Sequence, residues 1–231
     1  MKVTVMGASG LIGSKVVELL RGDGHEVVGA SLSSGVNVLT GEGLADALTD
    51  ADALVDVTNS PSFDDDPVME FFTKSTTNLV AGAQAAGVKN YVALSIVGCD
   101  QLPESGYLRA KVAQEKLITA SGLPYSIVRA TQFAEFTDAI TESLKVGDET
   151  RVPDALIQPI AADDVAAKVA AVASGTPLDG VVNIGGPEKI SFEQMARTSL
   201  AGRGDQTPVV VDTAARYFGT RLNQNSLVTT T

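Results

Sequence analysis

Residues 2–21 read KVTVMGASGLIGSKVVELLR, and no other stretch of the chain indicates a fold class so directly. The short β-branched run Lys2–Met6 predicts a buried strand, and Leu11–Arg21 carries apolar residues at helical spacing. Between them, Gly7, Gly10 and Gly13 form the pattern G-x-x-G-x-x-G. A loop of this kind between a strand and a helix is typical of dinucleotide binding, because its backbone can hold a pyrophosphate.

Each glycine of this loop has a predicted purpose. Gly7 permits the tight turn, Gly10 lets the backbone approach a pyrophosphate, and Gly13 lets the helix pack close to the strand. The amides at the helix start then face the anion. The candidate cofactor-binding residues of the loop are Gly7, Ser9, Gly10, Leu11, Ile12 and Gly13. The alternative is a tight turn that binds no ligand.

Strand and helix patterns alternate along the rest of the chain. Further strands are predicted at 26–30, 53–58, 91–95, 125–129 and 181–184, and helices at 44–48, 67–86, 107–120, 163–173 and 192–200. Apolar strands joined by helices form a parallel sheet that is covered on both faces. We therefore expect an α/β protein with a Rossmann-like doubly wound parallel sheet and a small C-terminal substrate lobe. In this single domain, 1–231, the dinucleotide-binding core is 1–132 and 161–186, and the substrate lobe is 133–160 and 187–231.

The residues after the second strand bear on the choice of cofactor. An acid at this point would bind the ribose 2′-hydroxyl of NAD and repel the 2′-phosphate of NADP. The chain instead places Ser31, Ser33 and Ser34 here, with no acid and no Arg or Lys beside them. This favours NADP over NAD. The alternative is that the serines form a polar turn without a ligand.

Three further residues predict a catalytic group. Ser95 closes the fourth strand, and Tyr107 and Lys111 are four residues apart, which puts them on one helix face. A neighbouring ammonium would lower the pKa of the tyrosine, which is ordinarily about 10. Tyr107 would then exchange a proton with a carbonyl or alcohol whose oxygen Ser95 binds, and Lys111 would also hold the nicotinamide ribose. The alternative is a chance match on an amphipathic helix.

The composition restricts the chemistry further. The 231 residues include one histidine, His25, in a predicted surface turn, and one cysteine, Cys99, so no metal site and no disulfide are expected. The net charge of −11 argues against nucleic-acid binding. No apolar run reaches the length of about 20 residues that spans a bilayer, so no membrane contact is expected. We expect a cytoplasmic protein that binds a small-molecule substrate.

The segments GASGLIGSKV, SGYLRAKVAQEKLI and YSIVRATQF resemble the short-chain dehydrogenase/reductase superfamily, and most closely its atypical NmrA-like branch of NAD(P)-binding proteins. The resemblance implies a Rossmann fold, an NAD(P) cofactor and a monomer or homodimer. It also places Thr58 and Asn59 near the cofactor ribose, and Thr131 and Phe133 near the nicotinamide. Catalytic relatives often carry an asparagine in the preceding helix, where this chain has Lys74.

Three functions remain open from the sequence. The first is an NAD(P)H-dependent reductase of a small carbonyl, quinone or related electrophile, with Tyr107 as proton donor, Lys111 as its pKa modifier and Ser95 as the ligand of the substrate oxygen. The second is a non-catalytic NAD(P)-sensing regulator that docks a partner protein. The third is an isomerase, epimerase or dehydratase that keeps NAD bound.

Overall fold

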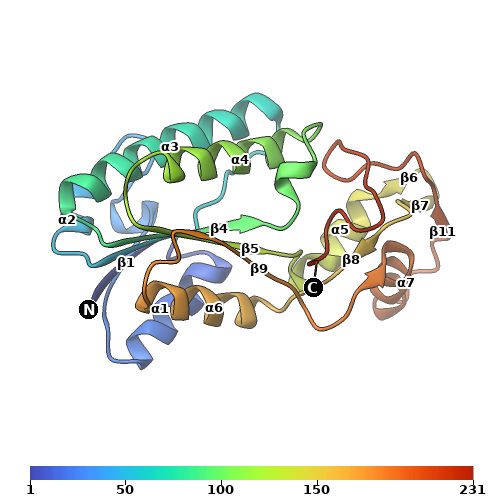
Figure 1. Ribbon diagram of the computed structural model, residues 1–231. Coiled ribbons are helices and arrows are strands. Elements are labelled where there is room, and N and C mark those ends of the chain that lie inside the picture. The colour runs from blue at the N-terminus through green and yellow to red at the C-terminus, as the bar shows by residue number, and fades with distance from the viewer. Residues whose placement is uncertain (231) are drawn as a thin grey trace.

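The computed structural model describes residues 1–230 and has a central six-stranded sheet with helices on both faces (Figure 1). All neighbouring strands of this sheet run parallel, in the order β2-β1-β3-β4-β5-β9. These strands are β1 (Lys2–Met6), β2 (Glu26–Ala30), β3 (Ala53–Asp56), β4 (Asn90–Ile96), β5 (Tyr125–Ala130) and β9 (Gly180–Ile184). The predicted Rossmann-like α/β class is confirmed.

The helices lie in two layers, which Figure 1 shows above and below the sheet. The helices of these layers are α1 (Leu11–Gly22) and α6 (Ala162–Ser174) on one face, and α2 (Leu44–Leu48), α3 (Asp65–Ala86) and α4 (Gly106–Thr119) on the other. Val3 and Val5 of β1 pack in the cluster that contains α1 and α6, whereas Met6 packs with α2 and α3. Because both faces are covered, the strands are apolar almost throughout.

Local chemistry explains two small differences from the predicted element ends. The helix expected from Pro67 begins at Asp65, with Asp64 as its N-cap residue, and ends at Ala86, which Gly87 follows in the left-handed region. Acidic residues in a first turn are favoured by the helix dipole. The strand expected to reach Thr58 ends at Asp56, because the Asp56 carboxylate accepts the Thr58 amide and turns the chain. Within residues 1–230, no helix combines the length and apolarity that a membrane crossing needs.

The strand order places a crevice beside the glycine loop. The chain passes from β1 to β2 on one side and then returns to pair β3 on the other side of β1. In doubly wound sheets, ligands bind outside the carboxyl ends of the strands at such a reversal. The glycine loop after β1 and the segment after β3 therefore flank the expected cofactor position.

A second group of small elements lies beyond the carboxyl end of the sheet, at the right of Figure 1. Its members are α5 (Thr137–Ser143), β6 (Lys145–Val146), β7 (Glu149–Val152), β8 (Leu156–Ile157), β10 (Ile190–Ser191), α7 (Phe192–Gly202) and β11 (Val209–Val211). Only the helix α7 was predicted from the sequence. The strands are two to four residues long, too short to show a period of two.

Candidate active site

The glycine loop has the geometry that its sequence predicts. Gly7 has φ +86°, and a Cβ atom there would lie 2.9 Å from the Val57 carbonyl oxygen and 3.1 Å from the Thr58 amide nitrogen. A Cβ atom on Gly13 would lie 2.1 Å from the Gly7 carbonyl oxygen, so only glycine lets α1 start this close to β1. At Gly10 a Cβ atom would meet only that same oxygen, at 3.3 Å. The space beside Gly10 is thus open to a ligand.

The start of α1 offers unpaired donors to that space. Gly10 caps the helix without a side-chain hydrogen bond, and the first turn carries no acid. Within residues 1–230, the amides of Leu11 and Ile12 have no backbone acceptor outside the helix and no side-chain acceptor. Ser9 and Leu11 are exposed and Ile12 is buried. Free amides at a helix N-terminus bind anions, so this loop fits a pyrophosphate.

The serines after β2 form a self-contained turn. Ser31 precedes the short 3₁₀ helix Leu32–Ser34, and its hydroxyl lies 2.8 Å from that of Ser33. The Ser34 hydroxyl accepts from the Ser31 amide at 2.9 Å and donates to the Ser31 carbonyl at 3.0 Å. The turn therefore satisfies its own polar groups, as the polar-turn alternative requires, and it still offers no acid to a 2′-hydroxyl.

Tyr107 lies at the carboxyl end of the sheet, in the first turn of α4. It is half-buried, and its hydroxyl donates to Asn59 Oδ1 at 3.3 Å. Burial raises the pKa of Tyr107 to about 12, although the hydrogen bond to Asn59 acts in the opposite direction. Lys111 was expected to lower the pKa of Tyr107, but burial of the phenol dominates and raises it.

The position of the Lys111 ammonium explains why it does not lower the pKa of Tyr107. Its side chain is 3% exposed, and its Nζ donates to the Leu94 carbonyl at 2.8 Å and to Gln114 Oε1. The same atom lies 4.4 Å from the centre of the Phe72 ring, whose centre is 6.2 Å from that of Tyr107. Burial lowers the pKa of Lys111 to about 8. The ammonium is thus directed at β4 and lies near the tyrosine without a hydrogen bond to it.

A buried acid that sequence reasoning missed holds this region together. Asp56 is 1% exposed, and its Oδ2 accepts from Gln114 Nε2 at 2.9 Å and from the Tyr91 hydroxyl at 3.1 Å. Its Oδ1 accepts from the Thr58 hydroxyl at 2.7 Å. The chain Asp56–Gln114–Lys111 therefore ties the end of β3 to α4. The available signal was an acid at the end of an apolar strand, which is costly to bury unless hydrogen-bonded.

Ser95 lies at the end of β4, 3% exposed, with its hydroxyl 3.9 Å from Cys99 Sγ. The Cys99 thiol donates to Glu115 Oε1 at 3.6 Å, and its burial raises the pKa of this thiol to about 11. Cys99 is therefore a poor nucleophile, because the thiolate is the reactive form. Glu115 also accepts from Arg129 at 2.6 Å and 2.9 Å in a bidentate pair. Ser95 is thus placed beside this polar network.

The remaining predicted residues lie after β3 and β5. Thr58 adjoins Gly7, and Asn59 is exposed and bound to Tyr107, so the glycine loop and the tyrosine are connected through this segment. The Thr131 hydroxyl is buried and donates to the Gln158 carbonyl, and Phe133 packs against Phe136 with ring centres 5.5 Å apart. Between them, the buried side-chain oxygen of Gln132 has no donor within the described residues.

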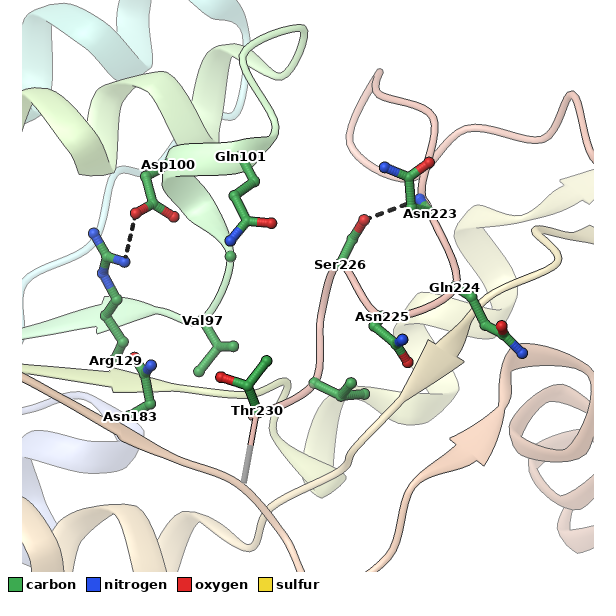
Figure 2. Close-up of a pocket in the computed structure, with 12 residues that line it drawn as sticks. Val97, Asp100, Gln101, Arg129, Asn183, Asn223, Gln224, Asn225, Ser226 and Thr230 are labelled. Carbon is green, nitrogen blue, oxygen red and sulfur yellow. Dashed lines mark hydrogen bonds and ion pairs between the residues drawn. The ribbon is translucent and has the colours of Figure 1, made fainter.

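The structure also has a cavity of about 520 Å³. Figure 2 shows Arg129 and Asp100, which are paired at 2.9 Å, on one wall and Asn223 and Ser226 of the C-terminal segment on the other. None of the predicted site residues lines it. Among residues 1–230, no three His, Cys, Asp or Glu side chains gather as they would to hold a metal.

Comparison with known proteins agrees with the fold. The profile of the NAD(P)H-binding family matches residues 7–175. The photosystem II assembly factor Ycf39 of Synechocystis sp. is 27% identical over 150 residues, covering 58% of this chain and 46% of the relative. The chain therefore spans about half the length of that factor.

Solved structures are similar over most of the chain. MoeE5 in complex with UDP-glucose and NAD has a TM-score of 0.74 and 22% identity, covering 95% of this chain and 87% of that one. The Thermus thermophilus UDP-glucose 4-epimerase complex with NAD has a TM-score of 0.73 and 19% identity, covering 98% and 92%. At these identities the likeness shows the fold. With the family match over residues 7–175, this chain belongs to the NAD(P)H-binding family, and it shares the fold of these two NAD complexes.

Proposed function

We propose that this protein is an NAD(P)H-dependent reductase of a small carbonyl, quinone or related electrophile, in the NmrA-like branch, with NADP as the preferred cofactor. The observation that carries the proposal is the continuous path from the glycine loop to a phenolic hydroxyl. Gly7 adjoins Thr58, and Asn59 next to it holds the Tyr107 hydroxyl at 3.3 Å. A proton donor thus lies beside the predicted cofactor crevice.

The cofactor site is proposed from the free groups of the loops. The amides of Leu11 and Ile12 hold the pyrophosphate beside Gly10. The buried side-chain oxygen of Gln132, in the loop after β5, has no donor among residues 1–230 and provides an acceptor for an amide N–H group. The turn after β2 has no acid, which favours NADP. When bound, the cofactor would supply a hydride, that is, two electrons and one proton, to the substrate carbon.

The chain itself supplies the proton. A tyrosine with a pKa of about 12 stays protonated at neutral pH, so Tyr107 acts as an acid toward an oxygen that gains negative charge. The O–H bond of Tyr107 breaks as the new O–H bond of the product forms, and water then returns a proton to the phenolate. Lys111 contributes positive charge behind the Phe72 ring, and Ser95 is proposed to orient the substrate oxygen.

The test is Tyr107→Phe, with Tyr125→Phe at the amino end of β5 as the matched control. A lost general acid lowers turnover by about a hundredfold or more. We expect that loss in a screen of carbonyl and quinone acceptors that follows NADPH oxidation, with the dissociation constant for NADPH unchanged. Unchanged turnover in Tyr107→Phe would show that this residue is not the donor.

A second function is favoured by two observations. The relative that matches 58% of this chain is an assembly factor, and Lys111 makes no hydrogen bond to Tyr107. A cofactor-binding regulator of partner proteins is thus the alternative. It predicts NADPH binding without turnover of any acceptor, and a partner affinity that differs between NADPH and NADP⁺. An isomerase or epimerase would instead convert its substrate without net cofactor consumption.

A further inference from the structure

Two aromatic rings from separate segments contact the ring of Tyr107. The Phe63 ring, from the segment between β3 and α3, meets the Tyr107 ring edge-on, with the ring centres 5.0 Å apart. The Phe218 ring, from the C-terminal segment, lies 5.3 Å from Tyr107 and 5.5 Å from Phe63. Phe63, Phe218 and the proposed proton donor Tyr107 thus contact one another, and we call Phe63 and Phe218 the aromatic pair.

Both members of the aromatic pair are largely open to solvent. Phe63 is 48% exposed and Phe218 is 39% exposed, whereas Phe72 and Phe192 are completely buried. Large apolar side chains that remain exposed together beside a site indicate a surface that a ligand covers. Both rings contact Tyr107 and remain exposed, whereas rings that pack in the core are buried.

The backbone supports this interpretation at Phe218. Its φ is +46°, a conformation that bulky residues rarely adopt, and such outliers concentrate at binding sites. The turn is held from both sides, because Tyr217 and Thr220 exchange backbone hydrogen bonds and Arg216 pairs with Glu104 at 2.8 Å. The turn thus keeps the Phe218 ring over Tyr107 at the cost of backbone strain.

The charges near the pair restrict the ligand further. Phe63 is followed directly by the acidic run Asp64–Asp66, of which Asp65 pairs with Arg109 at 2.7 Å. The chain as a whole carries a net charge of −11. An anionic substrate would meet like charge at this edge of the site, so the surroundings favour an uncharged ligand.

We propose that Phe63 and Phe218 determine substrate specificity by stacking a planar, uncharged aromatic carbonyl compound beside Tyr107. Offset or edge-to-face contacts suit such a ring, and its carbonyl oxygen accepts the Tyr107 hydroxyl. An aliphatic carbonyl compound lacks the ring faces and gains little from the pair. This inference rests on the proposed reductase function, which it makes more specific.

The test compares two acceptors in three variants. We expect Phe63→Leu and Phe218→Leu to lower kcat/KM for 1,4-naphthoquinone about tenfold, mainly through KM, and to change kcat/KM for 2,3-butanedione less than about twofold. Leu178→Ala, which alters an exposed apolar residue before β9, is the matched control and should behave as the unmodified protein. The single thiol, Cys99, is 1% exposed, so we expect it not to add to the quinone during the assay.

A binding measurement separates the two proposals. Equilibrium dialysis of 1,4-naphthoquinone against NADP⁺-loaded protein needs no turnover. If binding is seen and is lost in both variants while no acceptor is reduced, the aromatic pair stands and the reductase function is wrong. If reduction occurs and both acceptors are affected equally, the aromatic pair is wrong and the reductase function stands.

Two further results bear on the aromatic pair. A loss of NADP⁺ affinity in the variants that matches the loss for the quinone would overturn it, because the rings would then hold the cofactor. Thermal melting of each variant shows whether it folds. If Phe218→Leu does not fold, Phe63→Leu carries the test, since Phe63 lies on an exposed segment.

Discussion

Two alanine substitutions in the glycine loop should affect different properties, the stability of the protein for Gly13→Ala and its affinity for NADPH for Gly10→Ala. At position 13, alanine would put its Cβ atom 2.1 Å from the Gly7 carbonyl oxygen, so the start of α1 must move by about 1 Å. Overpacking of this kind costs about 2–3 kcal/mol. For a chain of this length, each kcal/mol lowers Tm by about 2–4 °C, so Gly13→Ala should melt about 4–12 °C lower.

Gly10→Ala should leave stability almost unchanged. Gly10 has φ −81° and ψ 174°, which any residue adopts, and its Cβ atom would meet only the Gly7 oxygen at 3.3 Å. Alanine is about 0.5–1 kcal/mol worse than glycine as an N-cap residue, and the reduced freedom of the unfolded chain offsets a similar amount. The added methyl group occupies the space assigned to the pyrophosphate, so NADPH affinity should fall about tenfold or more.

Calorimetric melting and titration with NADPH measure both quantities on the same samples. The expected pattern is a large loss of stability for Gly13→Ala and a large loss of affinity, without a loss of stability, for Gly10→Ala. Equal melting temperatures for the two variants would refute the packing argument. Full NADPH affinity in Gly10→Ala would refute the position of the pyrophosphate.

Three further predictions concern charge. Burial lowers the pKa of Lys111 to about 8, so between pH 8 and 10 the unfolded chain binds more protons and stability rises with pH. Between pH 8 and 10, the free energy of unfolding measured with urea should rise by about 2 kcal/mol more in the unmodified protein than in Lys111→Met. The same dependence on pH in both proteins would contradict this prediction. Glu115→Gln leaves the largely buried Arg129 without its bidentate partner and should cost about 3 kcal/mol, against less than about 1 kcal/mol for the more exposed Asp100→Asn. Ser31→Asp should weaken NADPH about tenfold and spare NADH, and equal effects on the two cofactors would count against the assigned 2′-phosphate position.

The central sheet could be predicted because its signals are local. Each strand is an apolar run between turn residues, and the helices carry their own caps, such as Asp64 before α3 and Gly87 after it. The small strands beyond the carboxyl end of the central sheet could not be predicted. They are two to four residues long and pair with distant partners, as Ile190 does with Ile157 and Val209 with Thr150. Such short strands form only because the rest of the fold brings their partners together.

Parts of the candidate site could likewise be predicted from the local sequence, and other parts depend on the tertiary structure. The glycine pattern is encoded locally, because the close approach at Gly13 involves Gly7 and Ala8 of the same loop, whereas the contact of Gly7 with Val57 and Thr58 comes from the tertiary structure. The helical spacing of Tyr107 and Lys111 is also local, yet it does not determine where the ammonium points. Lys111 is directed by the Leu94 carbonyl and by Gln114, which Asp56 holds from another strand.

The surroundings of Tyr107 could not be predicted from any single stretch of the sequence. Phe63 and Phe218 are far apart in the sequence and meet at Tyr107 only when the C-terminal segment folds against the start of α4. The backbone pattern of residues 2–21 is sufficient to indicate a dinucleotide loop, because hydrogen bonding and steric limits act between neighbours. The acidity of the tyrosine and the shape beside it depend on burial, and burial is a property of the assembled chain.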